Sequence, residues 1–394
     1  MKQKIQRFLV DKKFVLKIFI LFALIASFQS FFLNQKTIQK GTQTLSSYNN
    51  YTIFKESFHH LKNKQDLYIL YPEEHWDLYK YTPAFSVFFG LFATFPDLIG
   101  LSLWNLLNAL ILLFAIYYLP RMTTQQKGIA LLIVLIELMT SMQNEQSNAL
   151  VAGLIILTFG LLENKKYFFA TCCIVFSVFI KLFGIIGFIL FLFYPKKMKL
   201  ALYTLFWISF FFIIPLLFVN LDHYLSLFIS YKNMLLNDHS LSHGISIMGW
   251  LKTWFGINTN KNILVLAGLF SLLIPFIRLS EYKNYNFRLL ALSSVLLWIV
   301  IFNHKAESAT FIIAMSGVSL WFINAKKNIL NITLFICAFT LTSLSPTDIF
   351  PKFLQNEFII PFTLKAFPCI LIWLKINYDM LVVKRNNLTE VPAI

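Results

Sequence analysis

Long apolar runs separated by short polar connections recur along almost the whole chain. The first run extends from about Phe14 to Leu33, and the others lie at about 99–119, 129–143, 149–163, 167–180, 183–195, 200–220, 263–278, 289–302, 309–324, 328–344 and 358–376. A helix needs about 20 mainly apolar residues to cross a hydrocarbon core of about 30 Å. The pattern therefore predicts an all-α polytopic membrane protein, with about twelve transmembrane helices in a single membrane domain over residues 1–394.

Several of these runs are shorter than a full crossing requires, so the pattern does not define their ends sharply. The pair at 167–195 is short enough to form a bent or re-entrant hairpin instead of two full spans. The first run follows a basic start, but it is long for the core of a signal peptide and no small-residue cleavage site comes after it. We expect it to be retained as the first span.

Two connections, at 34–98 and 221–262, are much longer than the rest and rich in aromatic residues, which indicates ordered structure. The first of them contains a helical repeat of apolar positions, which predicts an amphipathic helix lying on the membrane surface. The repeat consists of Tyr51, Phe54, Phe58 and Leu61. The apolar segment between Pro83 and Pro96 is too short to span and is predicted to form a second interfacial helix.

Composition supports a membrane location, because 58% of the residues are hydrophobic and only 13% are charged. Lys and Arg outnumber Asp and Glu by 34 to 18, a balance that also occurs in nucleic-acid-binding proteins. Here, however, most cations lie in every second connection, as the positive-inside rule requires. We therefore predict a multi-pass inner (plasma) membrane protein with both termini cytoplasmic and no nucleic-acid partner. The clusters are Arg121/Lys127, Lys165/Lys166, Lys196/Lys197/Lys199, Arg278/Lys283/Arg288, Lys326/Lys327 and Lys384/Arg385.

In this topology all seven histidines and most of the acidic residues fall on the outer side. The stretch YPEEHWDLYKYTP, residues 71–83, concentrates acids and aromatic residues between the two predicted interfacial helices. Any one of these acids can be an ordinary solvated loop residue, but a group of carboxylates at the membrane surface can supply a general base. The candidate bases are Glu56 and Asp66, together with Glu73, Glu74 and Asp77.

One lysine, Lys181, interrupts the apolar segment CCIVFSVFIKLFGIIGFILF. A charge at the centre of a membrane helix costs about 2.5 to 3.5 kcal/mol on insertion scales, so such a residue usually has a function. Lys181 can bind a phosphate, or it can extend to the outer headgroups without any catalytic role. Glu137, in LLIVLIELMTSM, is similar; it can face the bundle interior near Gln146 and Asn148, although a role as a partner for another helix is favoured.

The later outer connections add His239 and His243 in NDHSLSHGISIMGW, and His304 and Lys305 in IFNHKAESAT. These side chains can hold a phosphate or a sugar hydroxyl. The spacing of the two histidines in the first segment also suits zinc, but no third ligand motif accompanies them, so no metal site and no cofactor are predicted. The chain has neither a Gly-rich phosphate loop nor an exposed DxD pattern, which favours a lipid-linked donor over a nucleotide sugar.

Five short motifs follow one another in order along the chain. They are Asp66-Leu67-Tyr68 at the end of a helix, Tyr81-Thr82-Pro83 at the start of an apolar helix, Trp104 to Asn108 in the next span, the turn Glu145-Gln146-Ser147-Asn148, and Lys181 at the outer end of a later span. This order resembles the polyprenyl-phosphate-dependent glycosyltransferases of the GT-C superfamily, and within it glycosyltransferase family 87, whose members are mannosyltransferase-like. The resemblance covers most of the chain and is strongest from 49 to 200.

The resemblance implies a GT-C-like bundle with interfacial helices in the first outer loop. It also implies transfer of a hexose, with mannose as the first candidate, from a polyprenyl-phosphate donor to a glycan or lipid acceptor among the membrane lipids. Lys181, His243, His304 and Lys305 are then candidates for binding the donor phosphate. Candidates for acceptor or sugar binding are Glu73, Glu74, Asp77, Tyr81, Gln146 and Asn148.

The chain departs from the family pattern at one position. The family usually has an aspartate, thought to be the catalytic base, about eighteen residues before the loop tyrosine; counting back from Tyr68 reaches Asn50. An amide cannot take a proton, so either a neighbouring carboxylate such as Glu56 or Asp66 acts in its place, or this branch of the family aligns differently, or the activity is altered. A catalytically inactive relative stays open as an alternative for the same reason.

Two further classes stay open. A transporter or flippase for lipid-linked saccharides has similar hydropathy, but it predicts binding groups near the bilayer midplane and repeated halves. The polar groups here lie mainly at the outer edge and no clear internal repeat is seen. A polysaccharide polymerase or ligase is expected to use outer-loop arginines, which this topology does not provide.

Overall fold

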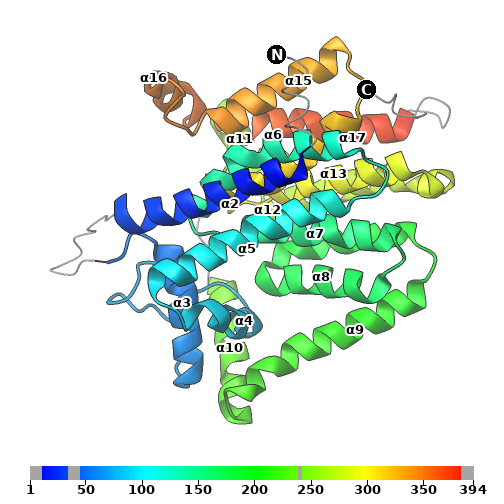
Figure 1. Ribbon diagram of the computed structural model, residues 1–394. Helices are drawn as coiled ribbons and strands as arrows, with labels where there is room; N and C mark the ends of the chain where they lie inside the picture. The colour runs from blue at the N-terminus through cyan, green and yellow to red at the C-terminus, as the bar shows by residue number, and fades with distance from the viewer. Residues whose placement is uncertain (1–10, 34–44, 238–241, 383–394) are drawn as a thin grey trace.

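The computed structural model describes residues 11–33, 45–237 and 242–382. Within these ranges the chain is helical and contains no strand, so the predicted all-α architecture is confirmed. Most of the long helices lie roughly side by side in one bundle (Figure 1). His239, Lys384 and Arg385, and residues 34–44 of the first long connection, lie outside the described residues.

The centre of the bundle consists of helices that are apolar on all sides. In α7 (Asn148–Glu163) every residue from Asn148 to Leu162 is buried, and in α14 (Phe311–Asn324) so is every residue from Phe311 to Trp321. α13 (Tyr285–Ile301) packs on α14, while α5 (Asp97–Tyr118) packs on α7 and on α2 (Lys12–Phe28). α6 (Thr124–Gln143) completes this core against α2 and α14. A helix without a polar stripe is stable only where other helices or lipid surround it.

Helices at the periphery expose large apolar side chains. In α9 (Lys197–Ile213), which continues as the 3-10 helix η3 (Ile214–Leu217), only Leu200 is buried. α12 (Lys261–Leu273) with η4 (Ile274–Ile277), and α15 (Ile329–Ala338) with the π-helix η7 (Phe339–Leu344), are similarly exposed. Apolar surface on this scale requires a lipid environment.

Four helices are long and apolar enough to cross a membrane: Lys12–Phe32, Asp97–Tyr118, Thr124–Gln143 and Lys197–Leu217. The remaining apolar helices in the described part of the chain have 10 to 17 residues. The multi-pass architecture is thus supported, while the total of about twelve spans stays a prediction.

The pair at 167–195 is indeed a hairpin of two short, unequal helices. α8 (Tyr167–Ile180) is an α-helix of 14 residues and therefore about 21 Å long. Its partner η2 (Leu182–Phe193) is a 3-10 helix of 12 residues, which at about 2.0 Å per residue covers about 24 Å. Lys181 lies between them in extended conformation, with φ −139° and ψ 122°. Both helices of the hairpin are shorter than a full membrane crossing. Lys181, which lies between them, is therefore expected to lie deeper in the membrane than the end of a full-length span.

The predicted continuous span at 358–376 is wrong. The structure has the short α16 (Lys352–Leu354), the π-helix η8 (Gln355–Ile359), a turn, and then α17 (Phe367–Val382). Pro361 lacks the N–H that a continuous helix needs, and Thr363 has a left-handed φ of 52°. The break matters because it directs Lys365 into the protein interior, where its side chain is buried.

The first long connection is folded onto one end of the bundle. α3 (Asn49–Lys62) lies at a large angle to α2 and α5, and α4 (Pro83–Ala93) lies beside it (Figure 1). The predicted apolar face of α3 is confirmed, because Tyr51, Phe54 and Leu61 are buried. The ring of Phe54 contacts those of Phe85 and Trp104. α10 (Leu221–Asn237) in the second long connection lies near the same end, and α11 (Ile247–Phe255) follows it.

Candidate functional site

The turn between α6 and α7, residues 144–148, is the centre to which the sequence motifs converge. Trp104 Nε1 donates a hydrogen bond of 2.9 Å to the carbonyl oxygen of Glu145. The backbone N–H of Leu150 donates one of 2.9 Å to Asn108 Oδ1. Both motif residues are fully buried, so they act as fixed supports under the turn. The backbone of Glu145 is left-handed, with φ 48°, and these supports hold it there.

Lys181 reaches this turn from the break between α8 and η2. Its Nζ lies 3.1 Å from Gln146 Oε1 and 2.7 Å from Asn148 Oδ1. It also lies over the rings of Tyr81 and Phe183, at 5.7 and 5.8 Å from their centroids. In the described parts of the chain no carboxylate lies within ion-pair distance of this ammonium group. Neutral oxygens therefore orient the charge of Lys181 without neutralising it.

The first outer loop is fastened to the same place. The Tyr68 hydroxyl donates a hydrogen bond of 2.9 Å to the carbonyl oxygen of Tyr81. The Thr82 hydroxyl donates one of 2.6 Å to the carbonyl oxygen of Phe179, near the end of α8. Ser147 Oγ lies 3.5 Å from the hydroxyl of Tyr81. The loop, the turn and the end of α8 thus meet around one phenol and one ammonium group.

The segment before α14 brings a carboxylate, that of Glu307, to the border of this site. Asn148 Nδ2 donates a hydrogen bond of 3.0 Å to the carbonyl of Ala309 in the 3-10 helix η6 (Ser308–Thr310). Glu307 caps that helix. Burial raises the pKa of the Tyr81 phenol, and the negative charges of Glu307 and Asp77 raise it further, against a lowering contribution from Ser147. The phenol is therefore a hydrogen-bond donor under physiological conditions, with both carboxylates within electrostatic reach.

Three of the residues predicted to bind phosphate lie in two coil segments that pair with each other. The backbone N–H of Ile245 donates to the carbonyl of Ala306 at 2.8 Å. Gly244 has φ 56°, and a Cβ there would lie 2.5 Å from the carbonyl oxygen of His304, so only glycine fits. This pairing brings His243, His304 and Lys305 to the segment that leads into η6.

The acidic residues of the first outer loop do not gather around one site. Both carboxylate oxygens of Asp66 are engaged, with the Tyr68 N–H at 2.9 Å and the Ser230 hydroxyl at 2.6 Å. Asp66 lines a separate cavity of about 340 Å³ between the loop and α10. Glu74 lies 2.9 Å from Nε2 of His60. Contacts with neighbouring side chains and backbone thus hold these two acids in place.

The other three loop acids differ in what surrounds them. Glu56 lies 3.6 Å from the ammonium group of Lys55, which is closer to Asp97, at 2.9 Å. Asp77 lies 3.2 Å from Lys80 Nζ and is more than half exposed. Glu73 is exposed to solvent. Asp77 is the predicted loop acid whose charge acts on Tyr81.

Asn50 makes a contact that an aspartate cannot make. Its Nδ2 donates a hydrogen bond of 2.9 Å to the carbonyl oxygen of Asn144, the first residue of the α6–α7 turn. A carboxylate has no donor for that carbonyl and would face it with like charge. The amide therefore fastens α3 to the turn, which gives a structural reason for its presence here.

Sequence reasoning missed a buried acid in the turn itself. The side chain of Glu145 is almost completely buried, and this burial raises its pKa from 4.5 to about 8, although a hydrogen bond from Ser30 opposes the shift. Glu145 belongs to the motif at 145–148, but only the amide side chains of that motif were predicted to be part of the site. At neutral pH the Glu145 carboxyl is therefore mostly protonated.

This carboxyl makes stability depend on pH. Because its folded pKa lies above the unfolded value, its contribution is complete below the unfolded pKa and is lost as the pH rises through the folded pKa. We expect the thermal midpoint of the purified protein to fall from about pH 5 to about pH 9, and Glu145→Gln to flatten that dependence. Thermal unfolding followed across this range checks it, with the exposed Glu73→Gln as control. Parallel curves for wild type and Glu145→Gln would show that the carboxyl is not the cause.

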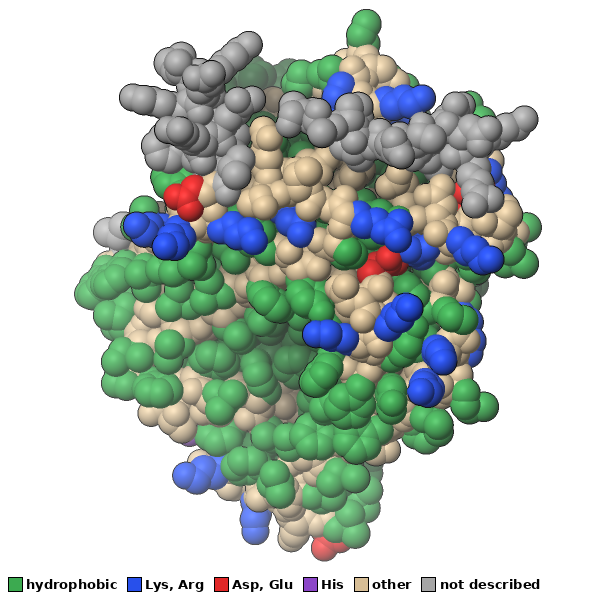
Figure 2. Space-filling view, turned by 45° about the vertical axis from the view of Figure 1, so that its right-hand side comes forward, with side chains coloured by type: hydrophobic (Ala, Val, Ile, Leu, Met, Phe, Trp, Pro, Cys, Tyr) green, Lys and Arg blue, Asp and Glu red, His purple; other side chains and the backbone are tan. Residues whose placement is uncertain are grey.

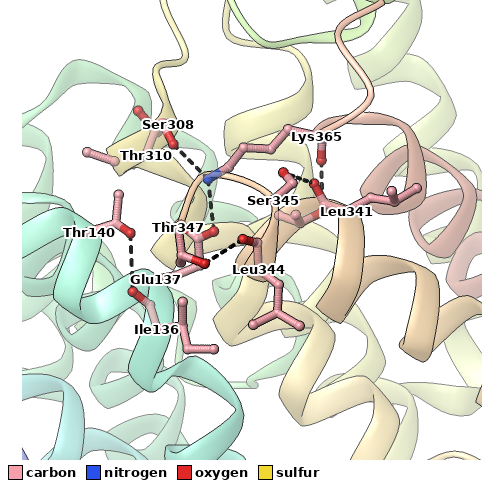
Figure 3. Close-up of polar contacts among 12 residues, drawn as sticks. Ile136, Glu137, Thr140, Ser308, Thr310, Leu341, Leu344, Ser345, Thr347 and Lys365 are labelled. Atoms are coloured by element: carbon pink, nitrogen blue, oxygen red, sulfur yellow. Dashed lines mark hydrogen bonds and ion pairs between the residues drawn. The ribbon is translucent and has the colours of Figure 1, made fainter. Parts of the chain in front are cut away.

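Sequence reasoning also missed a buried cation, Lys365, deeper in the bundle. Lys365 Nζ lies 2.9 Å from Glu137 Oε1 and 2.8 Å from Ser308 Oγ, and the three side chains converge from separate segments (Figure 3). The interpretation of Glu137 as a helix partner is confirmed by this ion pair. Lys365 escaped notice because the sequence pattern placed it inside a continuous span. The cluster holds η6, and thus the position of Glu307, against α6.

No group of three or more His, Cys, Asp or Glu side chains in the described ranges is arranged to hold a metal ion. The four cysteines are free thiols. The groups that the site itself supplies are an ammonium group, amides, a phenol and carboxylates.

Comparison with known proteins gives the family of the chain. The family model of glycosyltransferase family 87 matches residues 79–303, more than half of the 394 residues. The chain is also similar to the crystal structure of the Archaeoglobus fulgidus oligosaccharyltransferase in the apo form, with a TM-score of 0.43 and 12% sequence identity. That match covers 93% of this chain and 56% of the other, so the chain spans little more than half of that protein's length. No curated protein matches the chain.

Proposed function

The chain belongs to glycosyltransferase family 87 and is a membrane glycosyltransferase, and from this premise we propose that it moves a hexose from a polyprenyl-phosphate donor to a glycan or lipid acceptor at the outer face. The family predicted from the order of the motifs is thereby confirmed. The donor, the sugar, the acceptor and the residue roles below are our proposal. Mannose is the sugar that the family resemblance favours.

The observation that carries the proposal is the ammonium group of Lys181. It lies at the end of a shortened membrane helix, oriented by two amide oxygens and lacking a carboxylate partner within the described residues. A cation in this position is stabilised when an anion enters the site. The leaving group of a polyprenyl-phosphate sugar is a phosphate at membrane depth, and its negative charge increases as the glycosidic bond breaks. Lys181 can stabilise that increase.

The other groups have complementary tasks. Gln146 and Asn148 hold the ammonium group in place, and the Tyr81 phenol can donate to a phosphate or sugar oxygen. His243, His304 and Lys305 are proposed to contact the remaining phosphate oxygens from the neighbouring coil.

The acceptor hydroxyl must lose a proton as it attacks the anomeric carbon. Glu307 is the carboxylate whose charge acts on both Lys181 and Tyr81, so we propose it as the general base. Asp77, which acts on Tyr81 alone, is proposed to bind the sugar or the acceptor. Glu56 and Asp66, the bases expected from the sequence, are engaged with Lys55 and with Ser230 and the Tyr68 N–H.

Four variants separate these assignments. We expect Glu307→Gln to lower kcat by about 100- to 10,000-fold with a small effect on KM, because general-base catalysis contributes that much. Asp77→Asn is expected to raise KM for the acceptor, while Glu56→Gln and Asp66→Asn change either constant much less. Initial rates with a labelled polyprenyl-phosphate hexose measure these effects, and Glu357→Gln, which changes an exposed acid in η8, serves as the control. Full activity of Glu307→Gln, with loss in Glu56→Gln or Asp66→Asn, would return the base to the first outer loop.

The proposed orientation follows from charge. The basic pairs Lys165/Lys166 and Lys196/Lys197 lie at the end of the α8–η2 hairpin opposite to Lys181. The positive-inside rule places such clusters in the cytoplasm, which puts the Lys181 site on the outer side and both termini inside. An inner (plasma) membrane location is proposed on this basis.

A further inference from the structure

A cavity of about 660 Å³ lies at the start of α8 and α9, at the opposite end of α8 from Lys181. Four of the residues that line it are lysines, and aromatic side chains form much of the rest of its wall. The lysines are Lys165, Lys166, Lys196 and Lys199. The proposed transfer reaction uses none of them.

The positive charge of this cavity is not compensated by the protein. No acidic residue lines it, and in the described ranges none of the four lysines has a carboxylate partner. The acid closest to it in the chain, Glu163, accepts hydrogen bonds of 2.6 and 2.8 Å from Arg288 and one of 2.6 Å from Tyr194. Four like charges around one space repel each other, so an anion in that space is stabilising.

A neighbouring lysine shows the contrast. Lys197 directs its Nζ to the carbonyl oxygens of Phe191 and Leu192, at 2.6 and 2.8 Å, where it caps the end of η2. It does not line the cavity. In the connection between η2 and α9, Lys197 therefore has a structural role, while the neighbouring Lys196 and Lys199 line the cavity.

The backbone adds to the field of the lysines. α8 begins directly after Lys166 and α9 directly after Lys196, and neither of these N-cap residues offers a side-chain hydrogen bond to the first turn. The positive ends of two helix dipoles thus lie beside the same space. Their effect strengthens anion binding that the lysines already favour.

The surface next to the cavity is suited to acyl chains. Phe169, Met198 and Leu202 expose 59%, 72% and 58% of their surface. A band of lysine and arginine side chains crosses the face seen in Figure 2, and hydrophobic side chains spread out beside it. A free phosphate would gain nothing from this apolar surface, whereas a phospholipid can use both parts.

We propose that this cavity is a binding site for an anionic phospholipid of the cytoplasmic leaflet, whose phosphodiester headgroup lies among the four lysines and whose acyl chains lie along α8 and α9. Basic pockets between membrane helices on the cytoplasmic side bind such headgroups by the same combination of charge and hydrophobic contact. The bound lipid fills the cavity at the start of α8 and α9 and neutralises the lysines that line it.

The test is a lipid titration of the purified full-length protein by native mass spectrometry. Phosphatidylglycerol and phosphatidylcholine are added separately, and inorganic phosphate is added in a third series as competitor. The variant Lys165→Gln/Lys196→Gln/Lys199→Gln removes three cavity charges. The control Lys13→Gln/Lys283→Gln/Lys326→Gln removes three exposed basic charges that do not line the cavity.

We expect wild type and the control to retain phosphatidylglycerol at least about tenfold more strongly than phosphatidylcholine, and the cavity variant to lose about 100-fold in affinity for the anionic lipid. Equal losses in both triple variants would reveal a general surface-charge effect and overturn the proposal. Displacement of the lipid by millimolar phosphate would do the same, because it identifies a site for the free ion. If the cavity triple does not fold, Lys196→Gln and Lys199→Gln alone give the comparison, and unchanged affinity in both overturns the proposal.

Discussion

Lys181→Met is expected to lower the rate of sugar transfer by about 100- to 1000-fold, the usual loss when one preorganised donor to a developing negative charge is removed. Methionine keeps most of the length and apolar volume of the lysine stem but carries no charge. Because Lys181 Nζ is placed by Gln146 and Asn148 at 3.1 and 2.7 Å, the charge already occupies its working position before substrate binds. The fall should appear mainly in kcat, with a smaller rise in KM for the donor.

Two comparison variants make this prediction specific. Lys181→Arg keeps the charge, and we expect it to recover part of the activity despite its different shape. Lys62→Met removes an exposed lysine at the end of α3 and should leave the rate unchanged. Initial rates at saturating and limiting donor separate the two constants. If Lys181→Met keeps more than half of the wild-type kcat, the lysine is a headgroup anchor and not part of the active site.

The second large effect concerns the buried ion pair of Glu137 and Lys365. We expect Lys365→Met to lower the free energy of unfolding by about 3 to 5 kcal/mol, because it leaves a charge buried without its partner. Only one carboxylate oxygen of Glu137 is engaged by Lys365, and the other, Oε2, has no hydrogen-bond partner among the described residues. Among the described residues, Lys365 is the cation that forms an ion pair with Glu137, so its loss leaves this carboxylate without one.

The double variant Glu137→Leu/Lys365→Met supplies the decisive comparison. Replacing both members of a buried pair by apolar residues is often neutral, so this protein should regain most of the lost stability. Lys352→Met, which breaks the exposed pair of Lys352 and Asp348, is expected to leave stability almost unchanged, because solvent screens an exposed ion pair. Reversible unfolding in mixed micelles measures these three variants together with the single substitution Glu137→Leu. A double variant as unstable as the sum of its single substitutions would mean that the pair makes no net interaction.

The sequence predicted most helices because a membrane protein must place apolar residues wherever its helices contact lipid or each other. α5, α7 and α8 begin and end within about two residues of the predicted ranges, which is the usual uncertainty of helix ends. The break at 360–366 was missed because its apolar content continues unchanged, and only Pro361 and the backbone of Thr363 interrupt the helix. The use of a 3-10 helix for η2 likewise depends on packing and not on composition.

The candidate site was predictable where a single residue was out of place for its surroundings. Lys181 is a charge in an apolar run, and Tyr81, Gln146 and Asn148 belong to ordered motifs; the structure brings these four together. The tasks of the loop acids were not predictable. Whether an acid faces a substrate or a neighbouring side chain depends on tertiary contacts, such as the one between Asp66 and Ser230, which are 164 positions apart.

Buried acids and bases within turns gave the weakest signal. Glu145 follows the C-cap of α6, Asn144, and looks like an ordinary polar turn residue, yet it is almost completely buried. Glu307 stands in a mixed polar segment with His304 and Lys305, and its place beside the α6–α7 turn depends on the tertiary hydrogen bond between Asn148 and Ala309 of η6.

The central claim is that the outer-face site around Lys181 transfers sugar from a lipid phosphate. Its most direct test uses the purified protein in lipid vesicles with a labelled polyprenyl-phosphate hexose and a panel of glycan and lipid acceptors. We predict that wild type moves the label onto an acceptor and releases polyprenyl phosphate, while folded Lys181→Met does not. Label that crosses the bilayer still attached to its lipid, with no acceptor glycosylated by wild type across the panel, would contradict the account and indicate a flippase.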